Sequence, residues 1–272
     1  RDEKGNMENY KYYNDNNFVS SYRISKFVVD WMRERGDMRL PKLAEMMIKL
    51  DGKNADPTDL ANYKGVIPNP GATGDNNNTD MEDGSQSRLK SKWYLEPVGP
   101  SAMNIGYPEQ EFILAEAALR GWTEDDPETH YLNGIRAAHE FLGVSSADTR
   151  AYLGHEKVQF KGSDTEKLGK IITEKYLNFF MQGGNEAYFE LRRTGYPDFS
   201  AYLTHNTDQI YNDGYLPLRY RYPQSEIDNN NAQVSEAIKR LDKGDDRNSR
   251  MWLLQGSDPL FNPAPFPFRY KN

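Results

Sequence analysis

The spacing of apolar residues predicts helices separated by loop-rich stretches. From Phe18 to about residue 50, apolar residues recur mostly every three or four positions, as on one face of a helix. Gly36 ends the first part of this pattern, and residues 37–41 form a break before a second apolar stretch at 43–50. The N-terminal region is therefore expected to be helical with one interruption.

The clearest helical signals fall within residues 107–143. Pro108 suits the first turn of a helix, and Gly121 suits its C-terminal end. Asp126, followed directly by a proline, predicts the start of a second helix, which Gly143 would stop. We expect an antiparallel helix pair over this region.

Residues 165–193 are expected to hold a third long helix and a turn with paired arginines. The helix is predicted from about residue 165 to Gly183 and Gly184. Arg192 and Arg193 could recognise a carboxylate or phosphate, but planar guanidinium groups also tie helical turns to neighbouring acids. We favour the structural role.

The C-terminal part combines turns with one expected helix. Gly195 is predicted to take a positive φ after a helix, and Pro197 would prevent the helix from continuing. Prolines make residues 215–223 extended and partly exposed rather than part of a central strand. A last helix is expected after residues 229–231, ending at Gly244.

A loop-rich insertion is predicted at residues 51–92, where turn formers dominate and little can be buried. Its acidic tract, residues 75–83, could offer oxygen ligands to Ca²⁺, but it lacks the glycine and glutamate spacing of an EF-hand loop. We therefore prefer a solvated loop to a metal site. The aromatic pair Trp93 and Tyr94 at the end of the insertion favours a binding function.

Composition bounds the class of protein. The 272 residues, 37% hydrophobic and 28% charged, suit one large domain or two packed halves. The helical patterns and turn-rich stretches described above predict a mainly α fold with long loops and few short strands. A net charge of -7 makes nucleic acid an unsuitable partner and suits a neutral ligand. The chain has no cysteine, and no stretch approaches the roughly 20 apolar residues of a membrane span.

Motifs for enzymatic chemistry are missing from the sequence. It contains no GxGxxG, GxxxxGK[ST], HExxH or GxSxG, so dinucleotide, phosphate-loop, zincin and nucleophile-elbow chemistry lack their anchors. No two histidines fall on adjacent helical turns, so we expect ordinary surface histidines and no metal site or cofactor. The four are His130, His139, His155 and His205.

A glycoside hydrolase would need two suitably spaced carboxylates, and Glu109, Glu111 and Glu116 are candidates on one helix. Glu109 and Glu111 are better explained by the helix dipole. Glu116 is better explained by an ion pair with an arginine such as Arg192 or Arg193. We expect no catalytic residues.

Aromatic residues are where a binding function would show, since Trp and Tyr rings stack on the apolar faces of sugars. Trp31 and Trp122 lie on helical stripes and are expected to pack inside, and Trp252 is also expected to be buried. Trp93 and Tyr94 are the expected exposed platform. A helical scaffold that binds only protein remains an alternative, which a broad apolar patch would favour.

Several stretches resemble the C-terminal part of the SusD/RagB family of outer-membrane nutrient-binding lipoproteins. Asp37 to Pro41 is similar to the family's Asp-Pro-Arg turn, apart from Met38, and the Tyr107 helix is similar to its Tyr-x-Glu-x-x-x-x-x-Ala-Glu-Ala helix. The other matching stretches are Tyr63-Lys64-Gly65, the run from Gly183 to Pro197 with its Arg-Arg-Thr-Gly-Tyr-Pro turn, and the run from Pro217 to Asn230.

The resemblance implies a SusD-like helical fold, with residues 1–272 as a single C-terminal region and a tetratricopeptide-like half upstream. It implies non-catalytic binding of an oligosaccharide at the cell surface and delivery to a SusC-like TonB-dependent transporter. The first residue is Arg1, so a lipid anchor in the outer membrane would lie upstream. Tyr63, Trp93 and Tyr94 are the ligand-binding residues implied by position. Peptide capture within the family, or a glycoside hydrolase, are the alternatives.

Overall fold

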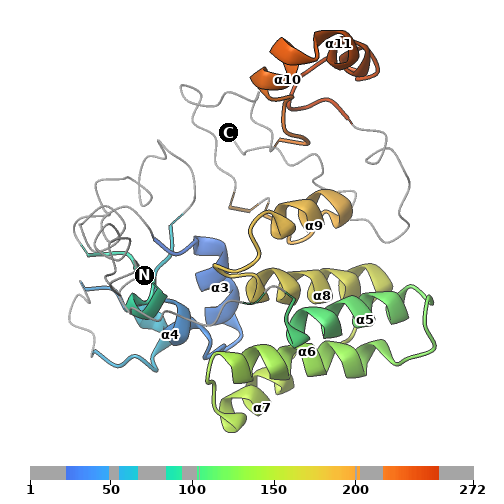
Figure 1. Ribbon diagram of the computed structural model, residues 1–272. Helices are drawn as coiled ribbons and strands as arrows, with labels where there is room; N and C mark the ends of the chain where they lie inside the picture. The colour runs from blue at the N-terminus through green and yellow to red at the C-terminus, as the bar shows by residue number, and fades with distance from the viewer. Residues whose placement is uncertain are drawn as a thin grey trace, which may run out of the picture. The chain divides into compact units, whose positions relative to one another are not determined.

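The structure is a computed structural model, and Figure 1 shows its helices. It describes residues 23–48, 55–66, 84–93, 103, 105–199, 201–202 and 217–250. Contacts divide the chain into two compact units, Arg1–Gly184 and Asn185–Asn272, which are described separately below. The described residues are mostly helical, which confirms the mainly α class.

The expected helix pair forms the centre of the first unit. Helix α5 spans Tyr107–Leu119 and helix α6 spans Pro127–Phe141. Pro108 lies in the first turn of α5, and the Asp126 carboxylate accepts a hydrogen bond from the Thr129 amide at 3.0 Å, which caps α6. Both predicted helix starts are therefore confirmed.

Helices α5 and α6 approach closely at Gly134. A Cβ atom added there would lie 2.6 Å from Cε1 of Phe112, so only glycine fits without a shift. Helix α8, Asp164–Asn178, packs against both helices, and the three lie side by side in Figure 1. Their apolar faces make the main core of the unit, with Phe112, Ala115, Ile135, Leu168, Ile171 and Ile172 almost fully buried.

Helix α8 ends earlier than predicted. It begins with a capping box in which the Ser163 hydroxyl and the Glu166 carboxylate each bind the other's backbone N–H. It stops at Asn178 rather than at the paired glycines, because the chain turns back on Phe179. The Gly183 amide donates to the Phe179 carbonyl at 3.0 Å, and the Phe179 ring lies where a Cβ on Gly183 would be.

The sequence did not predict the helix that follows α6. Helix α7, Ser146–Gly154, packs against α6. Its start carries a readable signal, because the Ser145 hydroxyl accepts a hydrogen bond from the Asp148 amide at 3.1 Å.

The N-terminal segment is only partly helical. Helix α3, Lys26–Glu34, is followed by Gly36 at φ +63° and by the short helix α4, Leu40–Leu43. The expected break at 37–41 is therefore partly wrong, because Leu40 and Pro41 belong to α4. Residues 18–22 and 49–54 lie outside the described residues.

The predicted insertion at 51–92 is more firmly packed at its end than its composition suggested. Gln86, Ser87 and Leu89 are buried, and Leu89 forms an isolated β-bridge with Ala44. A surface loop is therefore the wrong description of residues 84–90, because their backbone groups bond the segments beside α3 and α4. The candidate Ca²⁺ tract at 75–83 lies outside the described residues.

Regular turns and a close backbone contact also order the insertion near Tyr63. Short 3₁₀ turns form at η1, Leu60–Asn62, and at η3, Ser91–Trp93. Gly65 lies so close to the start of α3 that an added Cβ would be 2.5 Å from the Lys26 Cα. This close backbone approach explains a glycine at that position.

The second unit holds three short helices, α9 (Glu186–Thr194), α10 (Gln224–Asn229) and α11 (Asn231–Lys239), among its described residues. Gly195 ends α9 at φ +77°, as predicted. The arginine pair thus lies in a helix rather than in a turn. Helix α10 was not predicted.

Among the described residues, no helix is long and apolar enough to cross a membrane.

Candidate functional site

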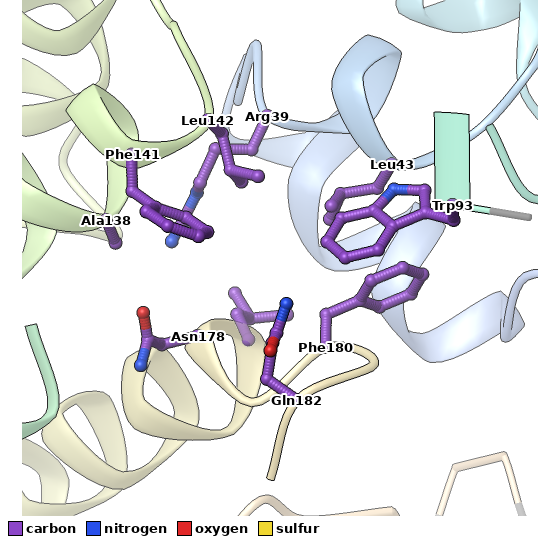
Figure 2. A pocket seen from close by; sticks show the side chains of 10 residues that line it. Arg39, Leu43, Trp93, Ala138, Phe141, Leu142, Asn178, Phe180 and Gln182 are labelled. Carbon is purple, nitrogen blue, oxygen red and sulfur yellow. The ribbon is translucent and has the colours of Figure 1, made fainter. Parts of the chain in front are cut away.

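A pocket in the first unit brings together residues from segments far apart in the sequence (Figure 2). It encloses about 290 Å³ of empty space, a volume that includes open solvent, and its enclosed part has room for no more than about one water. A sugar ring can therefore meet its mouth but cannot enter. The lining residues are Arg39, Leu43, Trp93, Ala138, Phe141, Leu142, Leu177, Asn178, Phe180 and Gln182.

Trp93 is placed at the wall of this pocket by the turn η3. Its ring meets Phe180 edge-on with the centroids 5.8 Å apart, and Figure 2 shows the two rings next to each other. The Lys92 ammonium lies 5.5 Å from the indole centroid. The Trp93 Nε1 is buried and has no hydrogen-bond partner among the described residues. Trp93 is thus half-buried rather than the fully exposed platform that was expected.

Aromatic rings and side-chain amides form the other walls. Phe141, 38% exposed, comes from α6, and Asn178 and Gln182 come from the end of α8 and the turn after it. Gln182 Oε1 accepts a hydrogen bond from the Met103 amide at 3.1 Å, which orients the amide group. Together with the aliphatic side chains of Leu43, Ala138, Leu142 and Leu177, these rings and amides offer contacts for both the apolar face and the hydroxyl groups of a sugar.

Arg39 forms the inner wall of the pocket and is almost completely buried. Its Nη2 donates to Asp37 Oδ2 at 2.6 Å and to Glu174 Oε2 at 2.8 Å. Tyr152 donates its hydroxyl proton to Glu174 Oε1 in a short hydrogen bond. Burial alone would lower the pKa of Arg39, but the Asp37 and Glu174 carboxylates hold that pKa above its usual value. The cluster therefore ties α4, α7 and α8 together through one fixed charge.

His139 completes this cluster from α6. It is fully buried, its Nδ1 lies 3.2 Å from the Thr149 hydroxyl, and its ring centroid lies 4.9 Å from that of Tyr152. Burial, and then the positive charge of Arg39, lower the pKa of His139 to about 3. The expectation that all four histidines lie on the surface is therefore wrong for this residue. His205 lies outside the described residues.

The other predicted binding residues are not brought to the pocket. Tyr63 is 1% exposed, and its hydroxyl donates to the Pro57 carbonyl at 3.0 Å. This burial argues against a ligand contact, although the assignment stays an untested prediction. Tyr94 lies outside the described residues, as does Trp252.

Comparison with known proteins identifies the family. The family described as "Starch-binding associating with outer membrane" matches residues 3–223. The chain belongs to this SusD-like family. No match was found among curated proteins.

Solved structures agree with this SusD-like assignment. A SusD homologue from Bacteroides fragilis is 31% identical to this chain. The match covers 89% of this chain and 54% of the homologue, with a TM-score of 0.77. A second homologue from the same organism is 30% identical. That match covers 85% of this chain and 51% of the homologue, with a TM-score of 0.72. A chitin-binding protein is 26% identical, with 85% and 49% coverage and a TM-score of 0.67. The chain thus spans about half the length of these structures.

Within this SusD-like chain, the residues of the Asp-x-Arg turn have a clear structural role. Asp37 and Arg39 bind each other and reach Glu174 on α8. The Arg-Arg pair is also held structurally, since Arg193 pairs with Glu190 at 2.6 Å and the Arg192 guanidinium lies 5.1 Å from the Tyr188 ring centroid. The structural interpretation of these arginines is consistent with both contacts.

Two of the candidate hydrolase carboxylates of α5 have close basic partners. Glu111 Oε2 lies 2.8 Å from His130 Nδ1, and Glu116 Oε1 accepts from Arg120 Nε at 2.8 Å. Burial pushes the pKa of Glu111 up, but hydrogen bonds from His130 and Tyr107 outweigh it and leave that pKa below its usual value. A general acid needs the opposite shift. The described residues hold no group of three or more potential metal-ligating side chains.

Two further aromatic positions differ from expectation. Trp122 is 71% exposed, because α5 ends at Leu119 and Gly121, at φ +70°, turns the chain away from the core. Its predicted packing role is wrong. Phe141 and Phe180, which sequence reasoning did not select, line the pocket instead. The sequence signal for Phe141 is its position as the last residue of a helix.

Proposed function

We propose that this SusD-like protein binds a glycan without cleaving it, at the outer-membrane surface, and delivers it to a SusC-like TonB-dependent transporter. In this proposal the protein is held at the membrane by a lipid anchor. The family description and a chitin-binding structure 26% identical to this chain support a carbohydrate ligand.

The observation that carries the proposal is the position of Trp93 at a narrow pocket walled by other aromatic rings and by amides. A pyranose ring would lie across the mouth, with its apolar face on the indole or on the Phe141 ring. Its hydroxyl groups would bond the amide groups of Asn178 and Gln182. Tyr94 follows Trp93 directly in the sequence and is proposed to extend this surface.

The electrostatics of the pocket also favour a neutral ligand. Arg39 is the one charged residue among the described residues that line it. Its charge is already opposed by the carboxylates of Asp37 and Glu174. Apart from the Lys92 ammonium beside the Trp93 ring, an anionic sugar would therefore meet no positive charge at the pocket that carboxylates do not oppose, and it would meet a net charge of -7 on the chain.

The experiment is calorimetric titration of the full-length protein with soluble polysaccharides and peptides, followed by product analysis of each mixture. We expect heat of binding with a glycan and an unchanged product profile. Released shorter sugars would show an enzyme. Binding to peptides alone would replace the glycan with a peptide ligand.

Trp93→Ala tests the placement of the ligand. We expect the mutant to lose about 1–3 kcal/mol of binding free energy, by analogy with other stacking platforms. Ile48→Ala is the control, because Ile48 is 68% exposed in the same unit and does not line the pocket. Unchanged glycan affinity in a folded Trp93→Ala protein would remove Trp93 from the site.

Delivery needs a separate test. We expect the protein to co-purify from outer membranes with a TonB-dependent transporter, and disruption of that transporter to stop glycan uptake while surface binding persists. Uptake that continues without any such transporter would contradict the delivery step.

A further inference from the structure

A second aromatic surface lies in the other unit. It consists of Tyr188 and Phe189 on α9 and Tyr220 on the segment that precedes α10. The Tyr188 centroid lies 5.6 Å from that of Tyr220 and 6.0 Å from that of Phe189. Tyr220 is 59% exposed and Phe189 is 42% exposed, whereas Tyr188 is half-buried. We call these three residues the α9 aromatic surface.

Hydrogen bonds fix the rings of this surface in place. The Tyr188 hydroxyl donates to the Pro217 carbonyl at 2.6 Å, which holds the 217–223 segment against α9. The Tyr220 hydroxyl donates to Asn185 Oδ1 at 3.2 Å, which ties the exposed ring to the start of the same helix. Rings locked in this way lose little conformational entropy when a ligand stacks on them.

Polar groups accompany the rings. The Arg192 guanidinium lies 5.1 Å from the Tyr188 centroid and 5.9 Å from the Phe189 centroid. The exposed amide of Asn185 lies at the Tyr220 edge. Ring faces next to amide and guanidinium groups match a pyranose, which presents an apolar face and a rim of hydroxyl groups.

We propose that the α9 aromatic surface is a second glycan-contacting site, on which sugar units of an oligosaccharide stack against the exposed rings of Tyr220 and Phe189. The proposal rests on the proposed function, because it assigns another contact for the same class of ligand. Tyr188 acts by positioning the two exposed rings. The two rings are tilted rather than coplanar with Tyr188, so the surface presents ring faces at an angle instead of one flat patch.

The test is isothermal titration of the full-length protein with maltoheptaose and with chitohexaose. Tyr220→Ala and Phe189→Ala are each expected to weaken binding of the oligosaccharide at least about fivefold. Tyr220→Phe keeps the ring and loses only the bond to Asn185, so it is expected to retain most of the affinity. Tyr107→Ala is the matched control, because Tyr107 is 57% exposed but belongs to the first unit.

A structural readout accompanies the titration. Amide hydrogen exchange should slow on binding in the peptides that cover α9 and residues 217–223. Wild-type binding that is equally strong in Tyr220→Ala and Phe189→Ala overturns this site and leaves the proposed function standing. An equal loss in Tyr107→Ala also overturns it, because the effect would then be unspecific. Wild-type protein that binds neither sugar, and none of the polysaccharides in the panel above, overturns the proposed function together with this site.

Discussion

Arg39 shows how one residue can serve structure beside a functional surface. Its guanidinium is 1% exposed and is shared between Asp37, two residues away, and Glu174, 135 residues away. Such a buried ion pair contributes little net stability compared with apolar packing, but losing one partner leaves buried charge uncompensated. Its value here is to fix the positions of the helices that line the Trp93 pocket.

Replacing Arg39 should therefore be costly. Arg39→Met leaves Asp37 and Glu174 buried without a counter-charge, and we expect the free energy of unfolding to fall by about 3–5 kcal/mol. Urea denaturation followed by circular dichroism measures this loss. Lys239→Met is the control, because Lys239 forms an exposed pair with Glu236, and its change should stay within about 0.5 kcal/mol. Equal effects of the two substitutions would contradict the role assigned to Arg39.

His139 gives the cluster a pH dependence. Its pKa is about 3 in the folded protein against an ordinary value of 6.5, so the unfolded chain binds the proton more readily between these values. The stability contributed by neutral His139 is complete above pH 6.5 and is lost as the pH falls toward 3. The steepest loss is about 1.4 kcal/mol per pH unit.

The difference between wild type and His139→Gln isolates this contribution, because carboxylates that titrate in the same range are common to both proteins. We expect the stability of the wild type relative to the variant to fall as the pH drops from 6.5 to 4. Parallel stability curves over this range would show that His139 does not carry the effect.

Helices α5 and α6 approach each other so closely at Gly134 that a single added methyl group tests their packing. Gly134→Ala would add a methyl group 2.6 Å from the Phe112 ring, and we expect overpacking to destabilise the protein by about 1–3 kcal/mol. Gly154→Ala at the end of α7 is the matched control. A Cβ there meets nothing within 4 Å, so the helix propensity of alanine should leave stability unchanged or slightly higher. Urea unfolding measures the free energy of unfolding of both variants. A Gly134→Ala protein as stable as the wild type would show that the two helices can move apart to accept the methyl group.

The same elements show what sequence can and cannot predict. The ends of α5 and α6 were predictable because Pro108, Asp126 and the glycines after each helix act locally. The end of α8 was missed because it depends on the packing of Phe179 against Gly183. Trp93 could be selected from its place after a polar loop, whereas Arg39 and Phe141 join it only through contacts between distant segments.

At the scale of the whole chain, ligand binding should be visible as a gain in the stability of the unit that binds the ligand. A ligand that binds only the folded state raises the free energy of unfolding by about 2.7 kcal/mol at a concentration of 100 times its Kd. The Trp93 pocket lies in unit Arg1–Gly184 and the α9 aromatic surface lies in unit Asn185–Asn272. An oligosaccharide bound at either site should stabilise the unit that carries that site.

Differential scanning calorimetry with and without maltoheptaose measures this, and Trp93→Ala and Tyr220→Ala separate the contributions. We expect maltoheptaose to raise the unfolding temperature of the wild type by several degrees, and each variant to show a smaller rise at the same ligand concentration. A full rise in Tyr220→Ala would confine binding to the first unit, because loss of that ring would then cost no affinity. Loss of the rise in Trp93→Ala alone would make the pocket the sole source of the stabilisation. Reduced rises in both variants, with wild-type stability in the absence of sugar, would show that glycan binds at both sites.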